Sequence, residues 1–241
     1  MFTDNNIILK QAGSTNFYAL ELKSAAVFKE GLVVTADFQT GGKGQRGKEW
    51  ESNRGENLLL SVVIESNISI DNQFDLNILS SLAVMDSLKS YDIDSQIKWP
   101  NDILVNKCKI AGILIQNLIS KNRITHTVIG IGLNINQIEF TKFYPSATSI
   151  QKELGAIINI SDFKDSLLNA LQLRLENYRL NSDLKEEYLS NLFQKDKVAT
   201  FESNNQKFMG IIRGVTKSGL LQIETENSLK EFNLQEVKML F

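Results

Sequence analysis

The sequence of 241 residues contains only one cysteine, Cys108, one histidine, His126, and two prolines. A single cysteine excludes both an intramolecular disulfide and a zinc site built from several cysteines, and it is typical of a reducing compartment. No hydrophobic run is long enough to cross a bilayer, and the N-terminus, Met-Phe-Thr-Asp-Asn-Asn, lacks the basic and apolar regions of a signal peptide. We therefore predict a cytoplasmic protein that does not associate with membranes.

An excess of positive charge is also absent. The chain has 26 Lys and Arg residues against 28 Asp and Glu residues, so its net charge of −2 gives no support for nucleic-acid binding by bulk electrostatics. Hydrophobic residues make up 42% and charged residues 22%, which is ordinary for a globular protein that can bury a core. The length fits one mid-sized domain with a small second domain.

A basic, glycine-rich segment stands out at residues 40–50. It contains Gly41, Gly42, Gly44 and Gly47, interleaved with Lys43, Arg46 and Lys48. Glycines let the backbone approach a ligand closely, and bare amides beside cationic side chains suit an anion such as a phosphate or a carboxylate. The composition alone fits a flexible surface turn with solvated charges equally well.

Two nucleotide-binding motifs nearly match this segment, and we reject both. Gly42, Gly44 and Gly47 match G-x-G-x-x-G, while Gly42, Gly47 and Lys48 match most of the P-loop pattern. Both mechanisms need a helix directly after the glycines, so that its N-terminus faces the phosphates. The residues that follow favour no helix, and Glu49 stands where a P-loop has a serine or threonine. We therefore expect a strand, a basic loop and another strand.

Hydrophobic periodicity divides the rest of the chain into helices and strands. We predict strands over 7–10, 32–39 and 58–64, a β-meander over 96–136, and helices over 17–29, 74–91, 163–178 and 184–193. Ser161 and Asp162 are the expected N-cap of the third helix. After Lys195 the pattern changes to short strands over 198–201, 208–215, 220–223 and 229–233. We therefore expect two domains, residues 1–194 and an all-β unit of SH3-like size at residues 195–241.

Two polar stretches are candidates for a site, and each also has a simpler explanation. Ser14–Asn16 precedes the first predicted helix, where a serine or threonine serves as an N-cap without further function. In Lys98–Asp102, Pro100 stiffens the chain at a strand end and so holds a cation, an amide and a carboxylate on one bend. The alternative for this second stretch is an ordinary polar turn.

Three residues interrupt the apolar strands of the meander. Lys109 opens the apolar run that ends at Leu114, and a lysine in such a strand is usually an edge residue with its ammonium in water. Gly130 and Gly132 lie within the last strand. Glycine weakens packing there and often marks the close approach of a ligand or another backbone.

Taken together, these stretches resemble the catalytic region of biotin–protein ligases. In chain order the matching stretches are Ser14–Asn16, Gln39 with the loop through Trp50, Gly55–Leu58, Lys98–Asp102, Lys109–Leu114, Ile129–Asn136 and Ala147–Ile150. Each one is weakly specific, but their order over nearly the whole chain is highly specific. The resemblance implies an α+β fold of the class II synthetase-like type, a mixed β-sheet flanked by helices, with a small C-terminal SH3-like β-barrel.

The resemblance also implies a two-step reaction. Biotin and MgATP would give biotinyl-5′-AMP and pyrophosphate, and the biotinyl group would then move to a lysine of a biotin carboxyl carrier protein. Since biotin and ATP are both anions, we expect Lys109 to neutralise the charge that develops between them, with Lys98 and Arg46 as further catalytic cations facing phosphates. No Ser–His or Cys–His pair is needed, so we interpret His126 and Cys108 as structural.

The binding residues follow from the same resemblance. For biotin they are Ser14, Thr15, Asn16, Gln39, Lys43, Gly44, Gln45, Lys109 and Gly112. For ATP they are Gly42, Lys43, Arg46, Trp50, Lys98, Asn101 and Asn134. Asn101, Asp102 and Asn134 would position Mg²⁺, which prefers oxygen ligands and often takes them through water. Closure of the glycine loop would keep water away from the reactive mixed anhydride.

The chain departs from the family pattern in two places. Family members commonly have arginine at the positions of Lys43, Gln45 and Lys48, whereas only Arg46 is an arginine here. Because arginine binds phosphate bidentately and lysine is a point charge, we expect weaker retention of the adenylate with unchanged chemistry. Some family members also carry an N-terminal DNA-binding domain, and only 13 residues precede Ser14. We therefore expect a ligase that does not bind nucleic acid.

Two other functions stay open at this point. Lipoate–protein ligases share the fold but have an Arg-Arg-x-x-Gly-Gly-Gly-x-Val-x-His type of stretch, which this sequence lacks. A non-catalytic biotin or nucleotide sensor would keep the pocket, but binding alone does not need Lys98, Asp102 and Lys109 together. We expect a monomer or a homodimer, and edge pairing of the strand around 128–133 is one route to the dimer.

Overall fold

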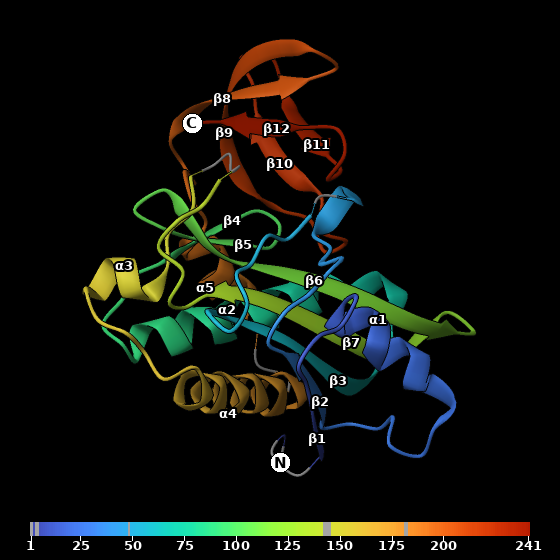
Figure 1. The fold of residues 1–241 in the computed structure, drawn as a ribbon. Helices are drawn as coiled ribbons and strands as arrows, with labels where there is room; N and C mark the ends of the chain where they lie inside the picture. Colours follow the sequence, from blue (N-terminus) through green and yellow to red (C-terminus); the bar gives the residue numbers. More distant parts are fainter. Residues whose placement is uncertain (1, 3–4, 48, 142–145, 181–182) are drawn as a thin grey trace.

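The computed structural model describes residues 2, 5–47, 49–141, 146–180 and 183–241, and the side chain of Arg46 lies outside this description. Its larger sheet contains β1 (Asn5–Leu9), β2 (Leu32–Ala36), β3 (Asn57–Ser69), β4 (Gln96–Lys98), β5 (Asp102–Val105), β6 (Cys108–Ser120) and β7 (Arg123–Asn134). In space the order is β1-β2-β3-β7-β6-β5-β4 (Figure 1). β1 and β2 are parallel, and the other neighbours are antiparallel. The predicted mixed sheet is therefore confirmed.

Helices cover one face of this sheet and leave part of the other face open. α2 (Asp75–Lys89) and α4 (Ile160–Arg179) pack on one face, with α5 (Lys185–Ser190) beside α2 (Figure 1). The short α1 (Thr15–Glu21) covers only part of the opposite face. Because side chains alternate along a strand, even-numbered residues of β3 such as Leu60 belong to the main core, while Val63 packs with Ala19 of α1.

The first helix is shorter than the sequence predicts. α1 ends at Glu21 and a 3₁₀ turn follows at Leu22–Ser24, whereas the prediction continued to residue 29. Ala25 then takes an extended conformation, with φ −92° and ψ 149°. Val27 packs against the small core under α1 without helical structure, so its hydrophobic spacing reflects burial rather than a helix.

The later helices also differ from prediction at their ends. Asn159 is the N-cap of α4, because its side chain accepts a hydrogen bond of 2.9 Å from the Ser161 amide, so the predicted Ser161–Asp162 cap is wrong. α5 ends at Ser190, and Phe193 instead donates its amide to the Ile97 carbonyl at 2.8 Å. The end of the predicted helix thus runs beside β4. α3 (Ile150–Leu154) was not predicted.

A second, antiparallel sheet follows after residue 197. It consists of β8 (Val198–Ser203), β9 (Gln206–Val215), β10 (Leu221–Glu224), β11 (Leu229–Phe232) and β12 (Lys238–Leu240), in the order β11-β10-β9-β8-β12. Asn204 and Asn205 both have positive φ in the turn between β8 and β9, as a tight hairpin requires. This sheet confirms the predicted small C-terminal β unit, although the three residues of β12 were too few for a recognisable pattern.

The two sheets meet at the turn between β4 and β5. Trp99 of this turn donates its indole Nε1 hydrogen to the Gly219 carbonyl at 3.0 Å. Gly219 has φ +94°, and a Cβ there would lie 2.4 Å from the Phe74 ring, so the close approach requires glycine. Tyr188 of α5 supports the same turn by donating to the Pro100 carbonyl at 3.1 Å. Burial raises the pKa of Tyr188, so its phenol stays neutral and can donate.

Two other findings concern surfaces. β7 is hydrogen-bonded to β3 on one side and to β6 on the other, so edge pairing of residues 128–133 between two copies, as the sequence suggested, is wrong.

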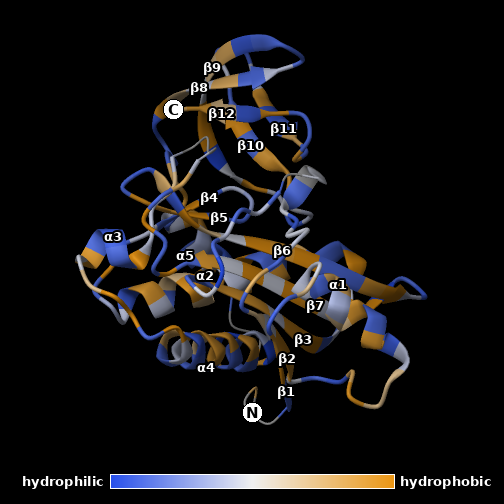
Figure 2. Cartoon of the chain, in the orientation of Figure 1, coloured by the Kyte–Doolittle hydropathy of each residue, from blue (hydrophilic) through white to orange (hydrophobic). Residues whose placement is uncertain are grey.

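Figure 2 shows mostly hydrophobic strands in the large sheet and hydrophilic residues along the outer side of α4. Across the described residues, no helix is both long and apolar enough to span a membrane.

Arg174 of α4 forms ion pairs with both α2 and α5 and so links the three helices. Its guanidinium lies 2.6 Å from Asp86 of α2 and 2.6 Å from Glu187 of α5, and its side chain is 14% exposed. We expect Arg174→Ala to lower the free energy of unfolding by about 1–2 kcal/mol, because it removes charge-assisted hydrogen bonds to partly exposed partners. Urea unfolding measures this loss.

Lys89→Ala is the matched control for Arg174→Ala. Lys89 forms an equally short ion pair with Asp94, 2.7 Å, but both side chains are mostly exposed, at 67% and 89%. Solvent screens such a pair, so we expect a much smaller effect. Equal losses for the two variants would contradict the assigned role of Arg174.

Candidate active site

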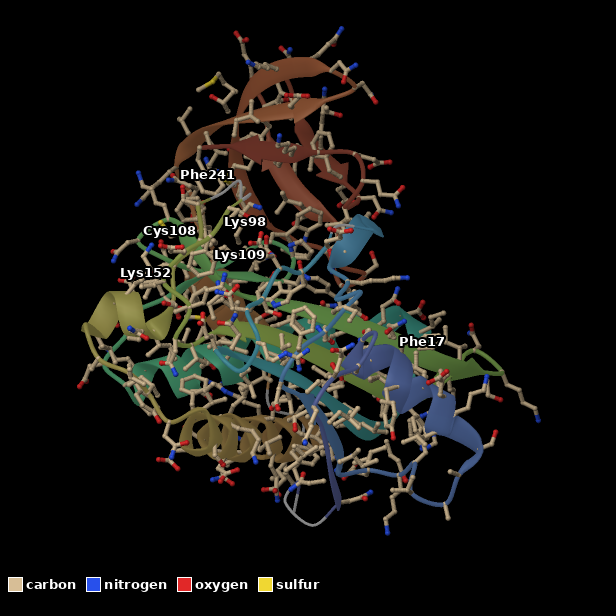
Figure 3. The ribbon with its side chains drawn as sticks, in the orientation of Figure 1. Phe17, Lys98, Cys108, Lys109, Lys152 and Phe241 are labelled. Atoms are coloured by element: carbon tan, nitrogen blue, oxygen red, sulfur yellow. The ribbon has the colours of Figure 1, made fainter. Side chains whose placement is uncertain are left out.

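A cavity of about 230 Å³ lies between the open face of the large sheet and the second sheet. In Figure 3, Lys98 and Lys109 lie together where the two sheets meet, and Phe17 of α1 lies well away from them. Most of the predicted site residues line this cavity: Ser14, Thr15, Asn16, Gln39, Lys43, Gly44, Gln45, Trp50, Lys98, Asn101, Asp102, Lys109 and Gly112. Segments far apart in the sequence therefore meet at one site, as the order of motifs suggested.

Three predicted residues stand apart from that group. The side chain of Arg46 lies outside the described residues, so its predicted catalytic and ATP-binding role stays a prediction. Gly42 and Asn134 are not among the lining residues. Asn134 is buried at the end of β7, and its amide donates to the Thr148 carbonyl at 2.9 Å.

The floor of the cavity is made flat by glycines of β6 and β7. Gly112 stands directly opposite Gly132 in the register of the two strands. A Cβ would lie 2.5 Å from the Trp50 ring at Gly132 and 3.1 Å from it at Gly112. The indole of Trp50 therefore packs directly against the backbone of Gly112 and Gly132. A larger residue at either position would crowd its ring, which accounts for a glycine at both.

Gly130 makes room for a different side chain. A Cβ at Gly130 would lie 2.2 Å from Asn16 Oδ1, a distance that no real packing allows. Asn16 is 3% exposed and sits across β3, β7 and β6 at this point. The glycine in the strand is therefore required by a polar side chain of the N-terminal helix.

The start of α1 supplies polar groups to the cavity. Ser14 occupies the N-cap position, but its side chain makes no capping hydrogen bond, so the simple N-cap explanation does not account for its hydroxyl. The amide of Thr15 donates to Gln39 Oε1 at 2.7 Å. This bond ties the helix to the end of the segment that leads into the glycine loop.

Charged groups lie at the other end of the cavity. Asp102 is 2.6 Å from the Lys109 ammonium and 3.5 Å from the Lys98 ammonium. All three side chains are only 20–22% exposed. Lys109 also lies 5.5 Å from the centre of the Trp50 ring, within the range of a cation–π contact. Lys109 thus points into the cavity, and the alternative of an edge residue with its head in water does not describe it.

The glycine loop folds back on itself over this site. The Trp50 amide donates to the Gly42 carbonyl at 2.9 Å, and Lys43 and Glu49 form an antiparallel bridge. Within the loop, Gln45–Gly47 forms a single 3₁₀ turn, and the next regular element is the strand β3. Among the described residues between Gly47 and β3, no α-helix begins, so rejecting the dinucleotide and P-loop motifs was correct.

The magnesium ligands expected from the sequence, Asn101, Asp102 and Asn134, stay a prediction, and each of them already has a protein partner. Both carboxylate oxygens of Asp102 face ammonium groups, which would repel a second positive charge placed beside them. The side-chain amide of Asn101 donates to the Ile113 carbonyl. Among the residues that the structure describes, no three His, Cys, Asp or Glu side chains could hold a metal ion together.

The second sheet and the segment between its strands β11 and β12 add lining residues that the sequence did not indicate. They are Leu221, Leu234, Val237, Lys238 and Met239. Phe241 also lies against Lys98, with the ammonium 5.8 Å from the ring centre. No motif marks these positions, and the strand that carries two of them is only three residues long. No residue after Asn134 was among the predicted site residues, so the sequence did not indicate this side of the cavity.

Cys108 and His126 lie outside the lining of the cavity. The His126 ring lies 5.4 Å from that of Phe28, between the ring centres, on the far part of β7. This agrees with their interpretation as structural residues.

Comparisons with known proteins agree with this geometry. The sequence model of the biotin/lipoate A/B protein ligase family matches residues 9–134. The solved structure of biotin protein ligase from Aquifex aeolicus in complex with biotin and ATP is similar to this chain, with a TM-score of 0.80 and 26% identity, and 98% of this chain and 99% of that one are covered. Since the family model matches more than half of the sequence, the chain belongs to the biotin/lipoate A/B protein ligase family.

Two curated relatives that are similar to this chain are named as biotin ligases or as a ligase/repressor. Biotin–[acetyl-CoA-carboxylase] ligase of Paracoccus denitrificans is 29% identical over 224 residues, which cover 89% of this chain and 92% of the relative. The bifunctional ligase/repressor BirA of Bacillus spizizenii is 28% identical over 221 residues and 87% of this chain. The match spans 66% of that relative's length.

Proposed function

We propose that the chain is an ATP-dependent ligase that activates biotin as biotinyl-5′-AMP and transfers it to a lysine of a biotin carboxyl carrier domain. One observation carries the proposal: a single cavity joins a polar subsite at Thr15 and Gln39 with an ammonium pair at Lys98 and Lys109. Biotin has a polar ring system at one end and a carboxylate at the other, so it matches both ends.

The first step is an attack by the biotin carboxylate on the α-phosphorus of MgATP. A carboxylate oxygen forms a bond to phosphorus, and the bond from that phosphorus to the bridging oxygen of the pyrophosphate breaks. Lys109 neutralises the charge shared between the two anions, and its compact ammonium costs no reorganisation because Asp102 and Trp50 already hold it. Lys98 lies 3.5 Å from the other carboxylate oxygen of Asp102, and in this proposal its ammonium binds the phosphates.

Asp102 has a different part in this proposal from the metal ligand first expected. Its carboxylate holds Lys98 and Lys109 in place before substrates bind. Two ammonium groups side by side would repel each other without such a counter-charge. The ion that accompanies ATP is then magnesium bound mainly to phosphates.

In the second step, the neutral amine of a carrier lysine attacks the acyl carbon of biotinyl-AMP. A carbon–nitrogen bond forms, AMP leaves with the electrons of the acyl–oxygen bond, and the amine loses a proton. Trp50 and the folded glycine loop cover the reacting centre and exclude water from the mixed anhydride. The acceptor is a carboxyl carrier domain, a proposal supported by the Paracoccus relative, which is named for acetyl-CoA carboxylase.

We further propose that residues 1–194 and 195–241 are two domains that share the site. The larger sheet ends before residue 195 and the second sheet begins after it. Lining residues of the second sheet, such as Lys238, support a role for the small domain in holding the nucleotide. Biotin-dependent exchange of pyrophosphate into ATP tests the proposed activity, and it separates the ligase from a lipoate ligase and from a sensor.

A further inference from the structure

Ser61 of β3 lies directly behind two residues that line the cavity. Its side chain is fully buried. Its Oγ lies 2.7 Å from Thr15 Oγ1 and 2.6 Å from Asn16 Oδ1. Ser61 does not itself line the cavity, so any effect that it has on a ligand must pass through Thr15 or Asn16.

The orientations of the Asn16 and Gln39 side-chain amides follow from neighbouring groups that can only donate or only accept a hydrogen bond. The Leu114 carbonyl can only accept, and it lies 3.1 Å from Asn16 Nδ2, so Asn16 must turn its Oδ1 toward Ser61. The backbone amide of Thr15 can only donate, and it lies 2.7 Å from Gln39 Oε1. Gln39 therefore turns its Nε2 hydrogens away from Thr15.

The hydroxyl hydrogens then have one arrangement that satisfies both short contacts. Asn16 Oδ1 can only accept, so the Ser61 hydrogen points to it. The 2.7 Å contact between the two hydroxyls needs a hydrogen as well, and Thr15 must supply it. The longest contact, 3.1 Å between Thr15 Oγ1 and Gln39 Oε1, is left without one. The chain of donors therefore runs from Thr15 to Ser61 to Asn16.

We propose that Ser61 is a positioning residue that sets the hydrogen-bonding polarity of the head-group subsite, so that it selects a cyclic urea. With its hydrogen committed to Ser61, Thr15 offers only lone pairs to a ligand, while Gln39 offers N–H donors. A cyclic urea has N–H groups that can donate to Thr15 and a carbonyl oxygen that can accept from Gln39. The dithiolane of lipoate and the alkyl chain of octanoate have neither. This inference rests on the proposed function, and it adds how the site distinguishes its substrate.

A double-mutant cycle tests the coupling between Ser61 and Thr15. The variants are Ser61→Ala, Thr15→Val and the double variant, and the measurement is the dissociation constant of biotin by isothermal titration calorimetry. We expect Ser61→Ala to weaken biotin binding by about tenfold in the wild-type chain, the effect of one hydrogen bond. In the Thr15→Val chain the same change should weaken it by no more than about twofold, because Ser61 acts through the hydroxyl that is already missing. The dissociation constant of ATP should stay within about twofold in every variant.

Ser81→Ala is the matched control. Ser81 is also fully buried, and its hydroxyl has no hydrogen-bond partner among the described residues, so its removal should leave biotin binding unchanged. Should Ser61→Ala fail to fold, Ser61→Cys retains a weak donor and should show the same pattern with a smaller loss. Unchanged biotin binding in the Ser61 variant, or an equal loss in both backgrounds, would overturn the inference. A wild-type chain that binds no biotin would overturn the proposed function as well.

Discussion

Lys109→Ala is expected to lower the rate of adenylate formation by about 10²–10³, the usual loss when one preorganised electrostatic donor is removed. The ammonium of Lys109 lies 2.6 Å from Asp102, and only 22% of the Lys109 side chain is exposed to solvent. Without it, Asp102 would face the incoming biotin carboxylate with one cation fewer, so the loss combines missing attraction with added repulsion. Single-turnover formation of biotinyl-AMP measures the rate.

Two further variants show whether charge alone explains the effect of Lys109. Lys109→Arg should also fail, because Asp102 at 2.6 Å and the Trp50 ring at 5.5 Å hold a compact ammonium, which a wider planar guanidinium does not replace. Lys89→Ala removes an exposed lysine with an aspartate partner at 2.7 Å and should leave the rate unchanged. A nearly normal rate for Lys109→Ala would return Lys109 to the solvated edge residue that its sequence context suggests.

Gly130→Ala is expected to weaken biotin binding by about tenfold to a hundredfold. The new Cβ would lie 2.2 Å from Asn16 Oδ1 and 2.7 Å from its Cγ. Asn16 would have to move, and it would then lose its hydrogen bonds to the Leu114 carbonyl and to Gln116, of 3.1 and 2.9 Å. Displacing Asn16 removes these two hydrogen bonds from the subsite, and a loss of about 1.4–2.8 kcal/mol of binding free energy corresponds to the stated range.

Gly13→Ala is the matched control for Gly130→Ala. A Cβ at Gly13 would meet no heavy atom within 4 Å, although this residue directly precedes the Ser14–Asn16 stretch. We therefore expect biotin binding within about twofold of wild type. If Gly130→Ala bound biotin as tightly as Gly13→Ala does, the contact between Asn16 and β7 would not position the subsite.

The sequence predicted best those parts of the site that rest on short, local motifs. Lys98–Asp102 was recognisable because a proline at a strand end fixes the direction of neighbouring side chains, and the structure brings Lys98 and Asp102 together with Lys109. Gly130 and Gly132 were noticed because glycine is unfavourable within a strand. The sequence did not reveal which side chains would fill the space above them, since Asn16 and Trp50 come from distant segments.

Other parts depend on tertiary contacts that leave no local trace. Ser61 lies within the apolar run of β3, and its two partners are 45 and 46 residues away in the sequence. Lys238 lies in a strand of three residues, which is too short for a hydrophobic alternation to appear. The helix predicted to residue 29 ends at Glu21, and Val27 and Phe28 pack against the small core from the irregular segment that follows.

The exchange of labelled pyrophosphate into ATP by the purified chain tests the central claim most directly. This reaction runs only when the enzyme forms and reverses an acyl-adenylate, so it measures the first chemical step without a carrier. We expect exchange when biotin is present and none without it, and Lys109→Ala should abolish most of the signal while Lys89→Ala keeps it. Exchange with lipoate or octanoate but not with biotin would contradict the assignment, and binding of biotin without any exchange would identify a sensor instead.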